Sequence, residues 1–160
     1  MRPIVIAGVV LAVIVGVWMF VHGAAGWYRS PSLGWLFPAL ATVTQLGVLI
    51  WGLGKTKAQG RRYGGQVVAG LLISLVGGLL IVVVSFIWSA AFPDVAEVME
   101  AIQADQFADQ GMSAEEIDEM LETTAFTRTP AFGAILGFIM TMLTGLVLSL
   151  IIAAFVRVKD

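Results

Sequence analysis

Residues 131–156 read AFGAILGFIMTMLTGLVLSLIIAAFV and contain no Asp, Glu, Lys or Arg. A helix needs about 20 mostly apolar residues to cross the hydrocarbon core of a bilayer, and this run exceeds that length. The run also lacks the alternation of apolar and polar residues that is typical of strands in a membrane barrel. It therefore predicts a transmembrane helix.

Three earlier stretches share this character. The predicted transmembrane helices are residues 3–21, 33–53, 66–92 and 131–156, and none of them contains a charged residue. The chain is 59% hydrophobic and 12% charged, whereas soluble domains are about 45–50% apolar and about 25% charged. The 160 residues are therefore predicted to form a single all-α membrane domain, a bundle of four transmembrane helices.

The N-terminal run has a second interpretation. Arg2, the apolar run that follows it and the small residues after His22 could together form a secretory signal peptide. However, the apolar run covers residues 4–21, which is longer than the about 7–15 residues of a usual signal sequence. A retained first helix is the favoured interpretation.

The basic residues predict the orientation of the bundle. Four spans put the N-terminus, the loop at residues 54–65 and the C-terminus on one side of the membrane. That side holds seven of the nine basic residues: Arg2, Lys55, Lys57, Arg61, Arg62, Arg157 and Lys159. Only Arg29 and Arg128 lie on the other side. Since Lys and Arg accumulate in cytoplasmic loops, both termini are predicted to be cytoplasmic. Lys55, Lys57, Arg61 and Arg62 are also candidate contacts for anionic lipid headgroups, at about 1 kcal/mol each.

All but one of the eleven acidic residues lie in residues 93–130, which are therefore predicted to be periplasmic. This segment is expected to form a hairpin of two short amphipathic helices joined at Gly111. Ser113 and Glu116 have the spacing of a capping box at the start of the second helix. A cation site is the alternative interpretation, but the Asp-x-Asp-x-Asp-Gly spacing of a calcium loop is missing. A solvated hairpin, whose apolar stripes lie on the bundle, the membrane surface or a partner, is favoured.

Small residues recur at every fourth position in the third and fourth spans, and also at Gly8, Ala12 and Gly16 in the first span. The fourth span carries Gly133, Gly137, Thr141, Gly145, Ser149 and Ala153, and the third carries Gly70, Ser74 and Gly78. Small residues allow membrane helices to approach closely. Packing within the bundle is the favoured interpretation of these stripes, and an interface to another subunit is the alternative.

Polar groups inside the predicted spans are few. Gln45 is the only amide well inside a span, and an interhelical hydrogen bond is favoured over contact with a substrate. The only histidine, His22, lies at the end of the first span, and the chain has no cysteine. Active transporters usually place ionisable residues within the membrane, so active transport is disfavoured. We find no catalytic, metal-binding or cofactor motif, and the sequence predicts a non-enzymatic protein without a cofactor.

Several short motifs in the second half carry a family resemblance. They are Tyr63-Gly-Gly-Gln66, Gly111-Met-Ser113 followed by Glu115-Glu-Ile117, Thr129-Pro130, and the run Gly145–Ala153 with Gly-x-x-x-Ser-Leu-Ile-x-Ala spacing. This order resembles the bacterial family called domain of unknown function 4199, over about residues 63–159. The resemblance implies a small four-span protein of the bacterial inner membrane, and it implies no activity.

Two functions are consistent with these features. The favoured one is an accessory or structural subunit of a larger inner-membrane complex, with the lipid bilayer and other membrane subunits or a second copy as partners. The alternative is a small carrier or lipid-handling protein with a cleft between its helices. No nucleic-acid partner is expected, and an intramembrane enzyme is disfavoured because the spans offer no paired carboxylates or metal ligands.

Overall fold

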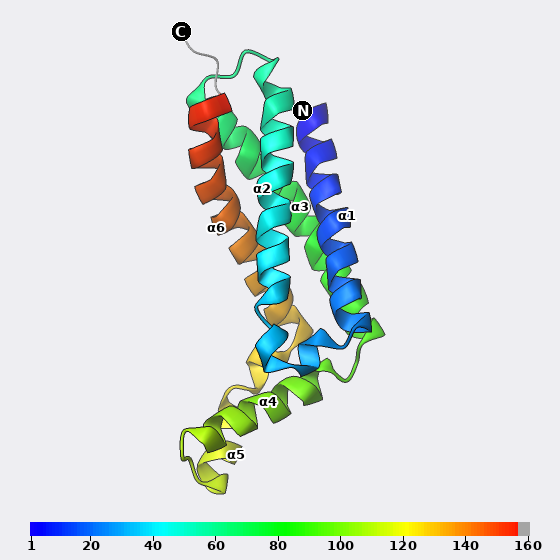
Figure 1. The fold of residues 1–160 in the computed structure, drawn as a ribbon, viewed down its shortest axis with the longest axis vertical. Helices are drawn as coiled ribbons and strands as arrows, with labels where there is room; N and C mark the ends of the chain where they lie inside the picture. Colours follow the sequence, from blue (N-terminus) through cyan, green and yellow to red (C-terminus); the bar gives the residue numbers. More distant parts are fainter. Residues whose placement is uncertain (157–160) are drawn as a thin grey trace.

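Four long helices form the body of the protein. The computed structural model describes residues 1–156, which contain no strand. The long helices are α1 (Arg2–Ala24), α2 (Leu36–Lys57), α3 (Tyr63–Ala91) and α6 (Pro130–Val156), shown in Figure 1. Each lies in a segment long and apolar enough to cross a membrane. The predicted all-α fold with four transmembrane helices is thereby confirmed, and the chain is a small multi-pass membrane protein.

The third helix lies at the centre of the bundle. It packs against α1 on one side and α6 on the other, while α2 contacts all three of these helices. Met1, the turn at residues 58–62 and the end of α6 lie together at one end, which we call the loop end (Figure 1). Arg157 and Lys159, on which the orientation prediction also drew, lie outside the described residues. The opposite end, where α4 lies, is called the hairpin end.

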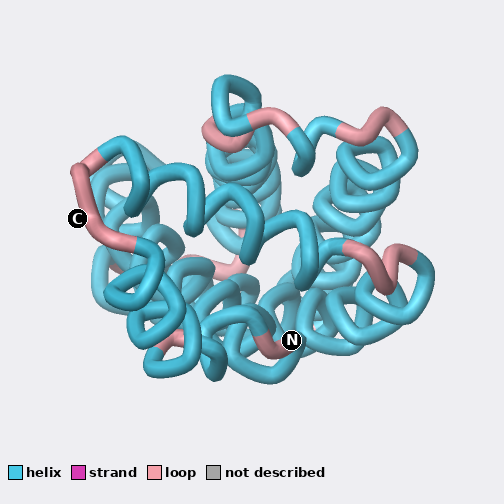
Figure 2. The backbone as a smooth tube through the Cα atoms, turned by 90° about the horizontal axis from the view of Figure 1, so that it is seen from below, coloured by secondary structure: helices cyan, strands magenta, loops and turns pink. Residues whose placement is uncertain are grey.

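The acidic segment forms the predicted helical hairpin. It comprises α4 (Val95–Asp109), α5 (Ala114–Thr123) and the short 3-10 helix η3 (Ala125–Arg128). Figure 2, viewed from the hairpin end, shows α4 crossing the end of the bundle. Gly111 joins the two helices with a φ of +83°, a conformation that glycine adopts without strain. The capping box between Ser113 and Glu116 is present, as predicted.

Several boundaries differ from the sequence expectation. The predicted basic loop at residues 54–65 is shorter in the structure, because α2 continues to Lys57 and α3 already begins at Tyr63. Lys55 and Lys57 therefore belong to the last turn of α2. Basic side chains are favourable there, since they complement the partial negative charge at a helix C-terminus. At the other end of this span, the short 3-10 helix η2 (Pro31–Leu33) precedes α2.

The loop half of the bundle is packed more tightly than the hairpin half. Every buried residue of α2 lies at or after Gln45. In α6 the buried residues are Gly145, Ser149, Ile152 and Ala153, together with Ala134 alone in its first turns. The bundle is thus closed near the loop end, and α2 and α6 are only partly covered near the hairpin end.

Candidate functional site

The small-residue stripes of α3 and α6 pack against each other over part of their length. A Cβ atom on Gly70 would lie 1.9 Å from Ser149 Oγ, and one on Gly145 would lie 2.0 Å from Ser74 Oγ. Farther along, a Cβ on Gly78 would meet Phe138 at 3.0 Å. Each close approach pairs a glycine on one helix with a side chain on the other, so the absent Cβ atoms allow the two backbones to come together.

The remaining part of the α6 stripe has a different environment. A Cβ on Gly133 or Gly137 would meet nothing within 4 Å, and both glycines line a cavity at the hairpin end. Thr141, between the two parts, donates from Oγ1 to the Gly137 carbonyl of its own helix at 2.8 Å. Ala153, the last member of the stripe, is fully buried. The stripe therefore has a packing half and an open half.

Gln45 joins three helices in the middle of the bundle. Its side chain is 5% exposed. Nε2 donates to Ser74 Oγ on α3 at 3.2 Å and to the Thr141 carbonyl on α6 at 2.8 Å. The amide thus lies directly beside the α3–α6 packing contact and links α2 to it.

A second buried polar contact was not predicted from the sequence. Thr56 Oγ1 donates to Gln66 Oε1 at 2.6 Å, and both residues are fully buried at the loop end. The sequence interpretation placed Thr56 in a loop and Gln66 at the border of a span. The sequence could have indicated this contact, because Thr56 and Gln66 lie on either side of a short turn. The helix ends that adjoin such a turn lie next to each other.

Aromatic residues gather where α1 and α3 reach the hairpin end. Trp88 Nε1 donates to the Met19 carbonyl at 2.8 Å, and Trp88 packs beside Phe92 and Tyr28. Tyr28 in turn donates from its hydroxyl to Asp94 at 2.9 Å, and Arg29 forms an ion pair with the same carboxylate. These contacts tie the α1–α2 connection to the start of the hairpin.

Two adjacent cavities, of about 340 and 380 Å³, lie under α4 at this end. Both are lined by Met19, Phe37, Trp88 and Met99, so they share a wall built from four helices. We call them together the hairpin-end crevice. His22 lines the first cavity, and its buried Nε2 has no hydrogen-bond partner. The lining is mostly apolar, with a few polar groups at its edge.

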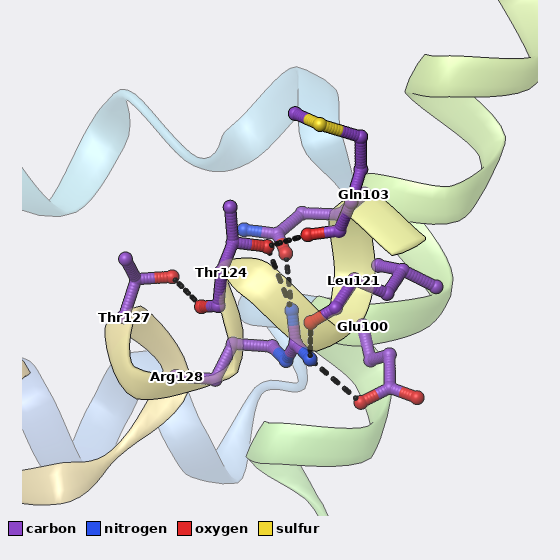
Figure 3. Close-up of polar contacts among 7 residues, drawn as sticks. Glu100, Gln103, Leu121, Thr124, Thr127 and Arg128 are labelled. Atoms are coloured by element: carbon purple, nitrogen blue, oxygen red, sulfur yellow. Dashed lines mark hydrogen bonds and ion pairs between the residues drawn. The ribbon is translucent and has the colours of Figure 1, made fainter. Parts of the chain in front are cut away.

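Arg128 holds the parts of the hairpin together (Figure 3). Its side chain is only 9% exposed and forms an ion pair with Glu100 on α4 at 3.1 Å. Nη1 donates to Gln103 Oε1 at 2.8 Å and to Thr124 Oγ1 at 3.4 Å, and Nη2 donates to the Leu121 carbonyl at 2.8 Å. One guanidinium therefore connects α4, the end of α5 and η3. The sequence interpretation used Arg128 only for orientation and missed this role.

The basic residues at the loop end have separate surroundings. Lys55 lines a crevice of about 290 Å³ together with Arg2, Ile6 and Trp51. Lys57 is exposed. Arg61 donates to Gln59 Oε1 at 3.2 Å and to the Gly65 carbonyl at 3.4 Å, and Arg62 is the N-cap residue of α3. The structure thus brings Lys55 together with Arg2, which had not been considered as its partner.

The capping box gives α5 a specific pH dependence. Hydrogen bonds from the Ser113 backbone N–H and hydroxyl lower the pKa of the Glu116 carboxyl from its ordinary value of 4.5. Because the folded pKa is lowered, the carboxylate stabilises the start of α5 fully above pH 4.5 and loses this effect as the pH falls through the lowered pKa. We expect the titration midpoint of Glu116 to lie below the ordinary range of a glutamate in a carboxyl ¹³C NMR titration. Ser113→Ala should return the midpoint of Glu116 to the ordinary range, and a normal midpoint in the unmodified protein would contradict the capping geometry.

The buried polar groups within the bundle are hydroxyls and amides. They are Gln45, Thr56, Gln66, Ser74 and Ser149. Among residues 1–156, no three His, Asp or Glu residues are placed to hold a metal ion together. Neutral groups of this kind serve to hydrogen-bond helices to one another or to a neutral ligand.

Comparison with known proteins gives one result. A family model described as "Protein of unknown function (DUF4199)" matches residues 5–158. Neither the comparison with curated proteins nor that with solved structures found a match. The matched range includes the first two spans, which the motif resemblance did not cover.

Proposed function

The chain belongs to the family of proteins of unknown function DUF4199, and on that premise we propose that it is a non-enzymatic accessory or structural subunit of a larger complex in a bacterial inner membrane. The main support is the closed loop half of the bundle. At its inner border the side-chain amide of Gln45 donates hydrogen bonds to Ser74 and to the Thr141 carbonyl. The glycines of α3 and α6 allow the two backbones to approach closely. A passage for a substrate through this half would require these contacts to break.

The surface of the hairpin supports a role in association. Glu115, Asp118, Glu119 and Glu122 are all exposed on α5. Arg128 on the same hairpin is directed inward and already paired with Glu100. The exposed face is therefore strongly acidic, and it suits a partner with a basic surface.

We propose that both termini are cytoplasmic and that the hairpin is periplasmic. Arg2, Lys55, Lys57, Arg61 and Arg62 all lie at the loop end, in agreement with the excess of basic residues on the cytoplasmic side of membrane proteins. The crevice shared by Arg2, Trp51 and Lys55 is then a suitable place for an anionic headgroup of the inner leaflet.

Cysteine labelling tests this orientation, because the chain contains no cysteine of its own. A cysteine is introduced by Gln110→Cys at the exposed tip of the hairpin, or by Gln59→Cys in the turn at the loop end. In cells with a permeable outer membrane and an intact inner membrane, a membrane-impermeant maleimide should label position 110 and not position 59. Both should react after detergent lysis, which controls for accessibility. Labelling of position 59 alone in intact cells would reverse the orientation.

Purification from the native membrane tests the proposed role. A tagged full-length chain extracted in mild detergent should elute with stoichiometric partner proteins. Charge reversal of Glu115, Asp118, Glu119 and Glu122 should release them. Thr123→Ala, an exposed change on the same helix, is the matched control. A lone monomer from the native membrane, with the bundle still folded, would overturn the proposal.

A lipid-handling role is the second candidate, and it is favoured by one observation, the mostly apolar hairpin-end crevice. The closed loop half argues against transfer across the bilayer by this chain alone. Binding of lipid in one leaflet is compatible with the same geometry.

A further inference from the structure

We propose that the hairpin-end crevice binds one hydrocarbon chain of a zwitterionic aminophospholipid from the membrane leaflet on the hairpin side. This site stands whether or not the protein is a subunit of a complex, because it rests on the crevice and its surroundings alone.

The crevice extends from the membrane surface into the apolar part of the bundle. Trp88, Phe92 and Pro93 border it near the end of α3, and Ile81 and Gly137 border its deeper part. At a rise of about 1.5 Å per residue, Ile81 lies roughly 15 Å from the hairpin-side end of α3. The cavity therefore reaches from the headgroup level into the hydrocarbon region of one leaflet.

The lining favours a flexible hydrocarbon occupant. Met19, Phe37, Ile81 and Met99 belong to the apolar wall, and methionine adapts to irregular ligands. Water is a poor occupant, because a buried water needs two to four polar partners. The cavity also remains open along α6, since a Cβ on Gly137 would meet nothing within 4 Å.

The size of the crevice excludes another helix as its occupant. A helix with its side chains is about 10–12 Å across and 5.4 Å per turn, so one turn occupies roughly 420–610 Å³, more than either cavity. The two cavities measure about 340 and 380 Å³. This is the lower range of pockets that enclose small molecules, about 300–1,000 Å³. A single acyl chain, which is much narrower than a helix, can enter cavities of this size, whereas a helix of a second copy cannot.

Polar groups at the mouth indicate the headgroup. The buried Nε2 of His22 lacks a hydrogen-bond partner, and the polar end of a lipid would supply one. Arg29 and Arg128 are each already paired with a carboxylate. Neither guanidinium is therefore free to pair with an anionic headgroup, which favours a zwitterionic headgroup whose ammonium can donate to His22 Nε2.

Native mass spectrometry of the full-length protein tests the site. The protein is delipidated in mild detergent and then titrated with phosphatidylethanolamine or phosphatidylglycerol of identical acyl chains. We expect one tightly retained lipid per chain, with phosphatidylethanolamine preferred about fivefold, because a charge-assisted hydrogen bond from its ammonium to His22 Nε2 is stronger than one from a neutral hydroxyl. Gly137→Leu should fill the crevice and abolish retention.

Gly47→Leu is the matched control, because position 47 also lies in a span and a Cβ there would meet nothing within 4 Å. It should retain lipid as the unmodified protein does. Gly133→Leu provides a second block should Gly137→Leu fail to fold, as judged by helical circular dichroism. Equal retention by folded crevice variants, absence of a retained lipid on the unmodified protein, or a dimer in its place would overturn the site. A preference for phosphatidylglycerol would overturn the headgroup assignment.

Discussion

Gly70→Leu should separate α3 from α6 and lower the free energy of unfolding by about 3 kcal/mol, at the upper end of the usual cost of overpacking. A Cβ on Gly70 would lie 1.9 Å from Ser149 Oγ and 2.7 Å from Ser149 Cβ. Ser149 Cβ is bonded directly to the backbone, so it cannot rotate away as the end of a long side chain would. Unfolding in mixed micelles with increasing dodecyl sulfate, followed by circular dichroism, measures the change.

A double-mutant cycle separates this contact from a general effect of glycine replacement. Gly70→Ala should be destabilising by itself, and Ser149→Gly in the same chain should restore much of the loss, because the two positions face each other. Ser149→Gly removes a hydroxyl that has no hydrogen-bond partner, so its own loss should be small. Gly47→Ala, where a Cβ would meet nothing within 4 Å, serves as the control. Failure of Ser149→Gly to rescue Gly70→Ala would contradict the proposed register of the two helices.

The features that could be predicted from the sequence are those set by local pattern and by the bilayer. The spans follow from uncharged apolar length, and the capping box at Ser113 follows from the spacing of two residues on one helix. The positions of the small residues were also visible. The sequence did not show that the stripe of α6 divides into a packing half at Gly145 and Ser149 and an open half at Gly133 and Gly137. Two straight helices that cross at an angle touch closely over a limited length, and a repeat of four residues does not specify where they diverge.

The contacts that were missed depend on tertiary placement. Thr56 and Gln66 bond because a turn folds two helix ends together, and neither residue belongs to a periodic pattern. The environment of His22 depends on the path of η2 and on α4, which covers the end of the bundle. Charge counting assigned Arg128 to one side of the membrane, but its partners lie on α4 and at the end of α5. Such contacts are determined only when the chain has folded.

Arg128→Ala should loosen the hairpin and leave the transmembrane bundle intact. The guanidinium is 9% exposed and bonds to Glu100, Gln103, Thr124 and the Leu121 carbonyl. Hydrogen bonds to a charged group contribute about 1.5–3 kcal/mol to stability, so the free energy of local opening should fall by that amount. Hydrogen exchange in residues 114–128 should then accelerate by about tenfold or more, as measured by mass spectrometry in micelles. Exchange in α2 should stay the same.

Two further variants distinguish the geometry of Arg128 from its charge. Arg128→Lys keeps the positive charge near Glu100 but cannot reproduce the planar fork of donors, so exchange of the hairpin should be intermediate. Arg29→Ala removes an ion pair whose side chains are 59% and 37% exposed, and its effect should be small because solvent screens exposed pairs. Since Arg128 also borders the second cavity, its alanine variant should weaken lipid retention along with hairpin order. Unchanged exchange in residues 114–128 would contradict the role of Arg128 in holding the hairpin together.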